Sequence, residues 1–332
     1  MPAEEARAAK AANEAAIFAR ANVVGVGIGN KTTRGRETGE PCIVVFVEAK
    51  RPEAQLRHRD VVPKAFGAVR TDVVETGRFH ARRSEQAMDL ERTKRIRPAP
   101  GGVSIGHVQI TAGTLGLLAR RHGRPVILSN NHVLANQNAG HVGDSILQPG
   151  PADGGRLQDT IARLVDFVPI QFKEPQPGPI ARFLARLFGP LLRAAGWGLK
   201  RLPSGRSNLV DAAVAEPIES RLVAPEILGI GRVRGTKEPD IGLRVRKSGR
   251  TTGVTAGRIT AIDAVVEVDY DGPTAIFREQ IVSDLLSKGG DSGSLVVDEG
   301  RHAVGLLFAG GATTTLINPI AAVAKSLDLV IE

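Results

Sequence analysis

Cysteine is almost absent from this chain of 332 residues, and aromatic residues are scarce. Cys42 is the only cysteine, so no disulfide can form within the chain, which excludes the disulfide-stapled scaffolds of small secreted proteins. Aromatic residues make up 4% of the sequence, so a core must be built mainly from Val, Ile and Leu. Cys42 opens the apolar stretch 42–47 and is expected to be a small buried residue of a strand.

Long hydrophobic runs are also missing. No stretch of about 18 apolar residues occurs, so we expect no transmembrane helix. Residues 1–20 are Ala-rich with mixed charge, which predicts a helix, and they lack the uninterrupted apolar segment of a signal peptide. Together with the single cysteine, this favours a cytoplasmic protein.

The net charge of +9 raises the question of a nucleic-acid partner. The 44 basic residues are spread along the whole chain, and no motif of stacking aromatic residues accompanies them. We therefore favour a solvated basic surface over a specific nucleic-acid site, and electrostatic attraction of acidic partners stays open.

The first hundred residues predict a small α/β domain over 21–95. Its strands are expected at 22–28 and 41–47, with more strand in 61–74, and the charged stretch 81–100 predicts a helix followed by a linker.

A glycine series within this first domain, Gly25, Gly27 and Gly29, looks superficially like a dinucleotide-binding fingerprint. The third spaced glycine is missing, and polar turn residues follow where a helix should begin. We interpret these glycines as parts of a strand edge and turn.

From residue 103 onward, short apolar strands alternate with turns in a sequence rich in glycine and proline, which indicates a sandwich or barrel. A closing helix is expected at 320–329. The segment 172–206 breaks the pattern: apolar residues fall on one helical face and arginines lie off it. Such an amphipathic helix can pack on the protein's own barrels or on a second copy, which makes a homo-oligomer plausible; a membrane contact through 180–201 is the least favoured alternative.

A serine lies on a glycine turn in Gly290-Asp291-Ser292-Gly293, between two apolar runs. Glycines let the backbone turn sharply and let two N–H groups point at one spot, as an oxyanion hole requires. Gly/Asp/Ser strings also mark ordinary turns, so the motif gains weight only if a base and a carboxylate accompany it.

The base candidate is His132, which follows the strand 125–129 and is the one histidine of seven at the end of a strongly apolar strand. The carboxylate candidate is Asp211, which precedes a small apolar strand and would need a hydrogen-bonding partner if buried. An imidazole Nδ1–H would be such a partner. The rival acids are Asp144, Asp159 and Asp166, which lie among loop-like residues.

The order His132, Asp211, Ser292 and the local strings resemble the chymotrypsin-like serine peptidases. Ser129-Asn-Asn-His-Val133 is similar to the histidine motif of the HtrA peptidases, and 247–253 with 257–261 is similar to a strand pair of the alpha-lytic and streptogrisin peptidases. The likeness is greatest to the group formed by the plant Narrow Leaf 1 protein and its bacterial relatives, and it covers 103–332. The family's cysteines are absent here, in agreement with a reducing compartment.

The resemblance implies a chymotrypsin-like double β-barrel with a helical insertion, and it does not explain residues 1–100. We therefore expect a mainly β protein in which the small N-terminal α/β domain precedes the barrels. The spacing fits, because the 79 residues from His132 to Asp211 shorten to 44 when the 35 residues of 172–206 are removed. Ser292 would be the nucleophile, His132 the base and Asp211 its orienting acid, with the N–H groups of Gly290 and Ser292 as the oxyanion hole.

Further roles follow from the resemblance. Asp291 is expected to form an ion pair with Lys247 or Arg246 that supports the oxyanion loop without cleavage of the chain. The specificity pocket is expected to take its floor from Leu286 and one wall from Phe308, Ala309 and Gly310. A neutral pocket of this kind predicts small to medium apolar side chains rather than Arg or Lys.

The sequence thus predicts a serine endopeptidase that cleaves polypeptides and needs no metal or cofactor, since no ligand cluster or phosphate-binding loop accompanies the triad. Two alternatives remain: a latent or inactive protease-fold scaffold, and a nucleic-acid-binding protein that exploits the charge.

Overall fold

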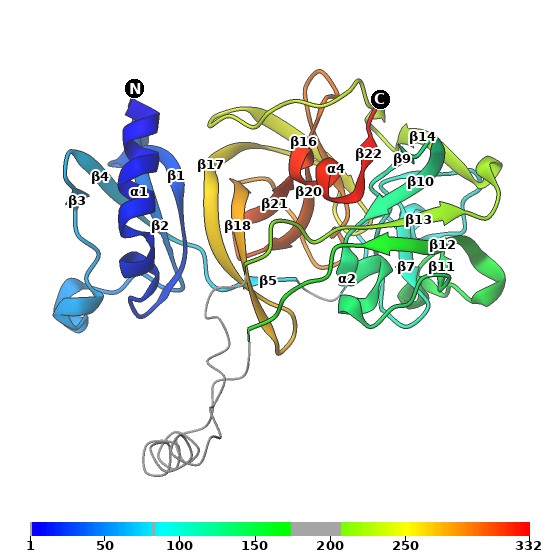
Figure 1. The fold of residues 1–332 in the computed structure, drawn as a ribbon, viewed down its shortest axis with the longest axis horizontal. Coiled ribbons are helices and arrows are strands. Elements are labelled where there is room, and N and C mark those ends of the chain that lie inside the picture. The colour runs from blue at the N-terminus through cyan, green and yellow to red at the C-terminus, as the bar shows by residue number, and fades with distance from the viewer. Residues whose placement is uncertain (1, 82–83, 174–206) are drawn as a thin grey trace, which may run out of the picture.

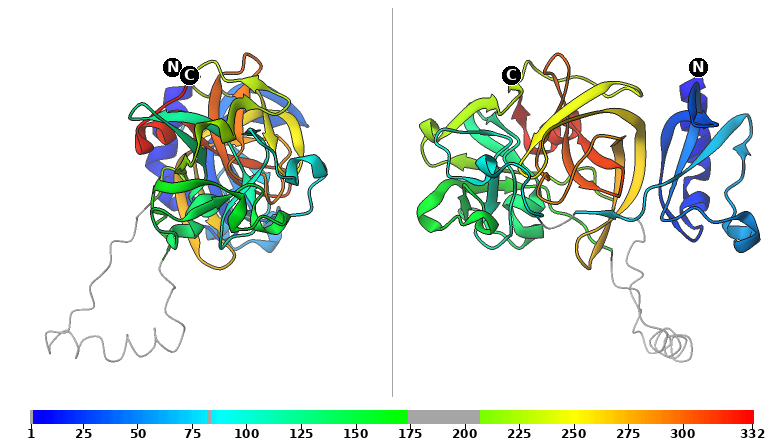
Figure 2. Two further views of the ribbon diagram at one scale, coloured as in Figure 1. Left: turned by 90° about the vertical axis from the view of Figure 1, so that its right-hand side faces the viewer. Right: turned by 180° about the vertical axis from the view of Figure 1, so that it is seen from behind.

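The computed structural model describes residues 2–81, 84–173 and 207–332. The predicted amphipathic helix at 180–201, with most of the predicted insertion 172–206, lies outside these residues. Three units follow one another along the long axis of the molecule (Figure 1). Viewed from behind, the N-terminal unit lies at one end, one barrel in the middle and a second barrel at the other end (Figure 2).

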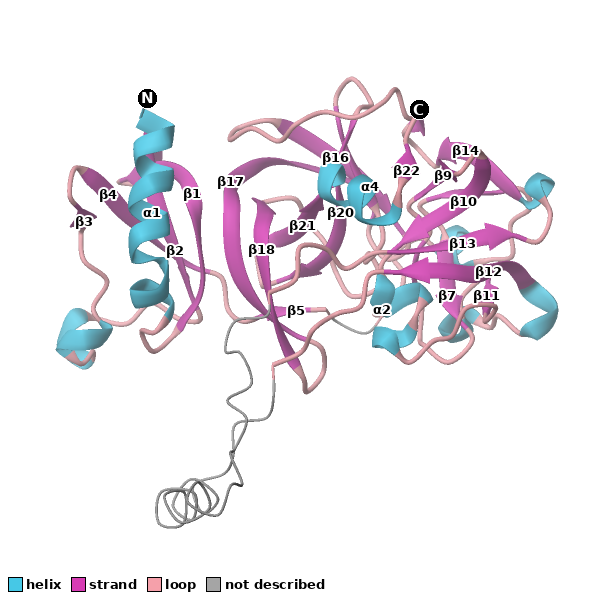
Figure 3. Ribbon diagram, viewed as in Figure 1, coloured by secondary structure: helices cyan, strands magenta, loops and turns pink. Residues whose placement is uncertain are grey.

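The N-terminal unit is a helix on a sheet, as Figure 3 shows. Helix α1 (Pro2–Phe18) packs on β1 (Val23–Thr33) and β2 (Arg36–Val47), next to β4 (Val69–Glu75) and β3 (Ala65–Phe66). Ala6 and Ile17 of the helix are fully buried against the apolar residues of this sheet. The predicted α/β character of this region is therefore observed.

Strand β1 is an inner strand, because it pairs with β2 on one side and with β17 of the central barrel on the other. Our prediction of a strand edge for its glycines was wrong. A side chain at Gly29 would put its Cβ 2.7 Å from the Thr260 carbonyl oxygen, so glycine permits a close approach of two strands here.

The central barrel is formed by strands from the second half of the chain. It consists of β16 (Arg244–Gly249), β17 (Gly253–Asp269), β18 (Thr274–Ser283), β19 (Leu295–Asp298), β20 (Ala303–Gly310) and β21 (Thr315–Pro319). The sheet closes because β16 pairs with both β19 and β17. Helix α4 (Ile320–Leu327) follows β21 close to the predicted position.

The end barrel is an eight-stranded curled sheet. Its strands are β7 (Ser104–His107), β8 (Gly113–Thr114), β9 (Leu117–Arg121), β10 (Arg124–Ser129), β11 (Ser145–Leu147), β12 (Thr160–Phe167), β13 (Ala213–Pro217) and β22 (Leu329–Val330). The C-terminal β22 pairs with β9, so the end of the chain returns from the central barrel to the end barrel. The predicted mainly β architecture with two barrels is confirmed.

The stretch 81–100 does not form the expected helix and linker in its described part. Its longest helical piece is a 3-10 turn at Leu90–Thr93, and β6 (Ala99–Gly101) pairs in parallel with β14 (Val223–Ile227), which also pairs with β15 (Gly231–Arg232). The amides of Glu85 and Met88 donate to carbonyls of the central barrel instead. Because those carbonyls supply acceptors, this stretch stays extended rather than helical.

Across the residues described, we find no helix that is both long and apolar enough to cross a bilayer.

Candidate active site

The register of two strands brings His132 and Asp211 together. Strand β10 pairs antiparallel with β13 so that Ser129 lies opposite Ala213. The chain beyond Ser129 therefore runs beside the chain that precedes Ala213. The short helix α2 (Asn131–Leu134) carries His132 at this point, and its Nδ1 lies 2.5 Å from Oδ2 of Asp211.

Asp211 is completely buried, and both oxygens of its carboxylate accept hydrogen bonds. Oδ1 accepts a hydrogen bond from the backbone N–H of His132 at 3.2 Å, and Oδ2 also accepts one from the hydroxyl of Tyr270 at 2.8 Å. The backbone N–H of Asp211 donates to Oδ1 of Asn318 at 3.0 Å. Tyr270 and Asn318 belong to the central barrel, so this carboxylate of the end barrel is fixed from both sides of the cleft.

Tyr270 is the single tyrosine of the chain and is fully buried. Burial, followed by the nearby Asp211 carboxylate, raises the pKa of Tyr270 well above its usual value. The phenol is thus neutral at physiological pH and can donate to the carboxylate. Its ring also packs edge-on against the imidazole of His132, with 5.8 Å between centroids.

In a neutral imidazole, a carboxylate at Nδ1 favours the tautomer with the proton on Nδ1, and that tautomer has its lone pair on Nε2. Nε2 is buried and accepts no hydrogen bond from the described residues. A buried acceptor without a partner is unusual in a folded protein and often marks a reactive group. The hydroxyl of Ser292 does not donate to it here; Ser292 Oγ donates to the carbonyl of Phe308 at 3.4 Å.

The turn that carries Ser292 joins β18 to β19 and depends on two glycines. Gly290 and Gly293 both have positive φ, +98° and +91°. A Cβ on Gly293 would lie 2.0 Å from Ser129 Oγ and 2.4 Å from the carbonyl of Thr114. The carbonyl of Ser292 itself accepts from the Thr114 N–H at 2.8 Å. The nucleophile turn is therefore packed directly on the strands of the end barrel.

The two predicted oxyanion donors are free. In the described structure, the backbone N–H groups of Gly290 and Ser292 donate to no carbonyl or side chain, whereas those of Asp291 and Gly293 each donate to a backbone carbonyl. Free N–H groups next to a serine hydroxyl can stabilise a developing oxyanion.

Lys247, and not Arg246, reaches Asp291. Lys247 Nζ lies 3.2 Å from Asp291 Oδ2, and both side chains are fully buried. Asp291 Oδ1 accepts from the amides of Thr251 at 2.9 Å and Thr252 at 3.0 Å, while Oδ2 accepts from the Thr252 hydroxyl at 2.6 Å. The backbone that precedes Ser292 is thereby anchored to β16 and to the turn after it.

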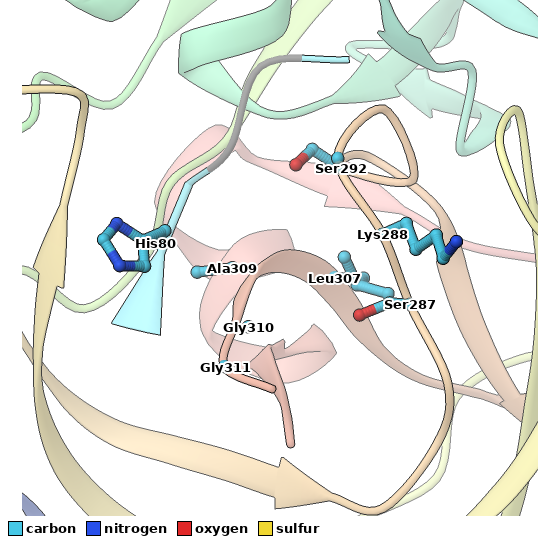
Figure 4. Close-up of a pocket in the computed structure, with 9 residues that line it drawn as sticks. His80, Ser287, Lys288, Ser292, Leu307, Ala309, Gly310 and Gly311 are labelled. Carbon is cyan, nitrogen blue, oxygen red and sulfur yellow. The ribbon is translucent and has the colours of Figure 1, made fainter. Parts of the chain in front are cut away.

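A pocket opens beside Ser292 (Figure 4). It is lined by His80, Ser287, Lys288, Gly289, Ser292, Leu307, Ala309, Gly310 and Gly311. Figure 4 shows the hydroxyl of Ser292 pointing towards the side of the pocket where His80 lies, while the ammonium group of Lys288 points away.

Two of the predicted pocket residues, Leu286 and Phe308, are not among those that line this pocket. Leu286 is 53% exposed, whereas its neighbour Leu285 turns inward and is 1% exposed. The ring of Phe308 is buried in the core, where it packs on Phe277 with 4.8 Å between centroids, while its carbonyl accepts from Ser292 Oγ. Ala309 and Gly310 line the pocket.

The three rival acids lie elsewhere, each with its own partner. Asp144 accepts from His107 Nε2 at 2.9 Å, Asp166 pairs with Arg121 at 2.6 Å, and Asp159 pairs with Arg95 at 3.2 Å.

Sequence reasoning missed Tyr270 and Asn318, and also the buried ion pair of Arg250 with Asp153. Arg250 lies within the string 247–253 that carries the resemblance, but no local motif marks Tyr270, Asn318 or Asp153; the one usable signal was that Tyr270 is the sole tyrosine. For a cofactor, the described residues offer no group of three His, Cys, Asp or Glu side chains placed to hold a metal ion.

No protein-family model matches the chain, and no curated protein matches it. Solved structures that are similar to it include chymotrypsin-like serine proteases. The chymotrypsin of Cellulomonas bogoriensis is 17% identical, with a TM-score of 0.43 over 70% of this chain and 98% of that one. The Nocardiopsis protease NAPase is 20% identical, with a TM-score of 0.44 over 70% of this chain and 100% of that one. An alpha-lytic protease homologue, N4, is 20% identical, with a TM-score of 0.44 over 70% of this chain and 97% of that one. Values this low assign no function to the chain.

Proposed function

We propose that this protein is a serine peptidase that cleaves polypeptides through an acyl-enzyme. The observation that carries the proposal is the state of His132: one ring nitrogen is held by the buried carboxylate of Asp211, and the other is a buried acceptor without a partner among the described residues. A purely structural histidine would have both ring nitrogens satisfied.

In the proposed reaction, Ser292 Oγ gives up its bond to the Phe308 carbonyl and donates to His132 instead. His132 Nε2 takes the hydroxyl proton as Oγ attacks the carbonyl carbon of the substrate, and the same proton then goes to the leaving amine. Asp211 holds the imidazole tautomer and stabilises the imidazolium. Tyr270 is assigned as a positioning residue, because it acts through Asp211.

The oxyanion that forms in this step would be stabilised by the free N–H groups of Gly290 and Ser292. Losing one such donor typically slows a reaction by about 100- to 1,000-fold. The Asp291–Lys247 pair supports the loop that presents these groups, since it fixes the residue between them. In this role the pair supports the oxyanion loop without cleavage of the chain, so no new N-terminus has to be formed.

For specificity, we propose a small or medium apolar side chain in the pocket. Its lining contains small and neutral residues such as Ala309 and Gly310, and none of the described residues that line it is acidic. An arginyl or lysyl side chain would find no counter-charge among these lining residues. Rapid cleavage after Arg with none after Ala or Leu would reject this specificity.

On sequence strings alone, we also propose membership of the group around plant Narrow Leaf 1, a cytoplasmic location and assembly into a homo-oligomer. The single buried cysteine supports a reducing compartment.

The proposed function is tested by a fluorophosphonate probe, which forms a covalent bond with an activated serine. Mass spectrometry of the intact protein should detect one adduct on the wild type and none on Ser292→Ala. Asp211→Asn, which keeps the shape of the site but loses the tautomer control, should be labelled on the order of 1,000-fold more slowly or worse. Labelling that survives in Ser292→Ala would remove the basis for the proposal.

A latent protease-fold protein is the second candidate. It is favoured by one observation, namely that Ser292 donates to Phe308 rather than to His132.

A further inference from the structure

A stretch of the chain's own backbone pairs with the strand that lines the pocket beside Ser292. Strand β5 (Phe79–His80) runs antiparallel to β20, with His80 opposite Gly310, which lines the pocket beside Ser292. It also runs parallel to β17, with His80 opposite Asp269. The Ala81 N–H donates to the Asp269 carbonyl at 3.0 Å, which continues the pairing by one residue.

The chain is described again from Ser84, next to the turn that carries Ser292. The Glu85 N–H donates to the carbonyl of Gly289 at 2.8 Å, one residue before the oxyanion glycine Gly290. Its carboxylate accepts from the Gly289 N–H at 3.4 Å, and its own carbonyl accepts from Arg250. The Met88 N–H donates to the Thr251 carbonyl at 2.8 Å.

We infer that the segment formed by 79–81 and 84–88, called the strap below, is an intramolecular competitor that occupies the substrate edge of β20 and keeps Ser292 latent. This inference rests on the proposed function. An extended polypeptide is recognised at a sheet edge through main-chain hydrogen bonds, which any sequence can make. A substrate peptide that pairs with Gly310 would need the position that His80 holds.

Tethering makes the strap an effective competitor. A segment joined to its site by a short connection has an effective concentration of about millimolar, so a free peptide at lower concentration displaces it poorly. Phe79 anchors the strap, because its ring is 1% exposed and meets Phe46 edge-on at 6.1 Å between centroids. Release therefore has to begin beyond Phe79.

The part beyond this anchor is built to open. Glu85, Gln86 and Met88 are exposed, with Met88 70% exposed, and Ala87 is the one buried apolar side chain among 84–88. The backbone of this part is held by bonds to Gly289, Thr251 and Arg250. Segments with few buried apolar contacts open at low free energy. Release would free the Gly310 edge for substrate and remove both Glu85 bonds from Gly289.

A reversible disulfide tests the inference in the full chain. His80 and Asp269 lie opposite each other on paired parallel strands, so the double variant His80→Cys/Asp269→Cys can lock the strap when oxidised and free it when reduced. The fluorophosphonate labelling rate should fall at least tenfold on oxidation and recover on reduction. The single variant Asp269→Cys, treated with the same oxidant, controls for oxidation of other groups, and its labelling rate should not change.

A second variant works in the opposite direction. Ala81→Pro removes the N–H that pairs with Asp269, and the matched Ala81→Ser keeps it. Loss of one such bond should raise the labelling rate about fivefold or more in Ala81→Pro, while Ala81→Ser should match the wild type. Ala81→Pro combined with Ser292→Ala must not label.

The outcomes separate the two hypotheses. Equal labelling rates in the locked, reduced, Ala81→Pro and wild-type proteins would overturn the strap inference and leave the serine chemistry intact. Absence of labelling in every form, including Ala81→Pro and the reduced double variant, would instead overturn the proposed function. A gain confined to the released forms supports both.

Discussion

Replacing either partner of the buried Asp291–Lys247 pair should damage the nucleophile turn, but by unequal amounts. The Asp291 carboxylate accepts from the amides of Thr251, Thr252 and Lys288 and from the Thr252 hydroxyl, besides facing the ammonium group of Lys247 at 3.2 Å. Every group around it is a donor, so the site needs an acceptor with two oxygens.

In Asp291→Asn, one oxygen becomes an NH2 group that must face at least two donors, whichever way the amide is turned. Removing one partner of a buried ion pair costs about 3–5 kcal/mol, and each buried donor without an acceptor adds about 1–3 kcal/mol. We therefore expect a loss of about 4 kcal/mol or more in unfolding free energy.

In Lys247→Met, the carboxylate keeps its four other donors, and the Met side chain fills much of the volume of the Lys stem. Hydrogen bonds from backbone amides stabilise an ionised carboxylate without a counter-charge. The expected loss is about 2 kcal/mol, below the usual range for a broken buried pair.

The assay is urea unfolding followed by the labelling rate with the fluorophosphonate probe, for both single variants and the double variant. Asp291→Asn should be the less stable single variant and should label more slowly. The double variant should lose less stability than the two single losses together, because the partners are coupled. A Lys247→Met variant as unstable as Asp291→Asn, or a strictly additive double variant, would refute this reasoning.

Three further predictions concern single residues. Tyr270→Phe keeps the buried ring but removes a hydrogen bond to a charged carboxylate, which is worth about 1.5–3 kcal/mol. The kcat/KM for a peptide substrate should therefore fall about tenfold or more, while the circular dichroism spectrum should stay unchanged. An unchanged kcat/KM would show that the phenol does not position Asp211. Burial raises the pKa of Cys42 to about 12, so a thiol reagent at pH 8 should react only after unfolding in urea. This folded-state pKa lies above the unfolded value of about 8.5, so the stability that Cys42 contributes is complete below about pH 8.5 and is lost as the pH rises towards about 12. Unfolding of the wild type and of Cys42→Ala at alkaline pH measures this loss. Rapid reaction of the thiol in the native protein would contradict the prediction. Gly293→Ala should cost well over 2 kcal/mol in urea unfolding, since its Cβ would lie 2.0 Å from Ser129 Oγ, whereas Gly123→Ala, at φ +78° with no atom within 4 Å, should cost only about 1–2 kcal/mol for the backbone conformation; equal losses would argue against the tight turn.

Sequence reasoning selects candidate residues most clearly where the chemistry is confined to a local motif. Ser292 stands out through its flanking glycines, and His132 through its place at the end of an apolar strand. Asp211 was harder to choose, and the antiparallel register of β10 with β13 explains its position beside His132. The two barrels and the N-terminal α/β unit follow from short apolar runs and turns, which report local periodicity.

What the sequence did not predict depends on contacts between distant segments. Tyr270 and Asn318 reach Asp211 from the other barrel, and no spacing rule encodes that approach. The charged stretch after residue 81 has helical composition, but in its described part its amides pair with carbonyls of the central barrel. Leu286 was assigned to a pocket by resemblance, whereas the alternation of side chains along an extended segment turns Leu285 inward instead.

The proposed function depends on acyl transfer to Ser292 with His132 as base. This step can be observed by rapid mixing of the Ala81→Pro protein with an activated acyl ester, followed by acid quenching and peptide mapping. We predict a burst of one leaving group per chain, with the acyl group on the peptide that contains Ser292, and no burst when His132→Ala or Ser292→Ala is added. A burst that persists without Ser292, or an acyl group found on another residue, would contradict the claim.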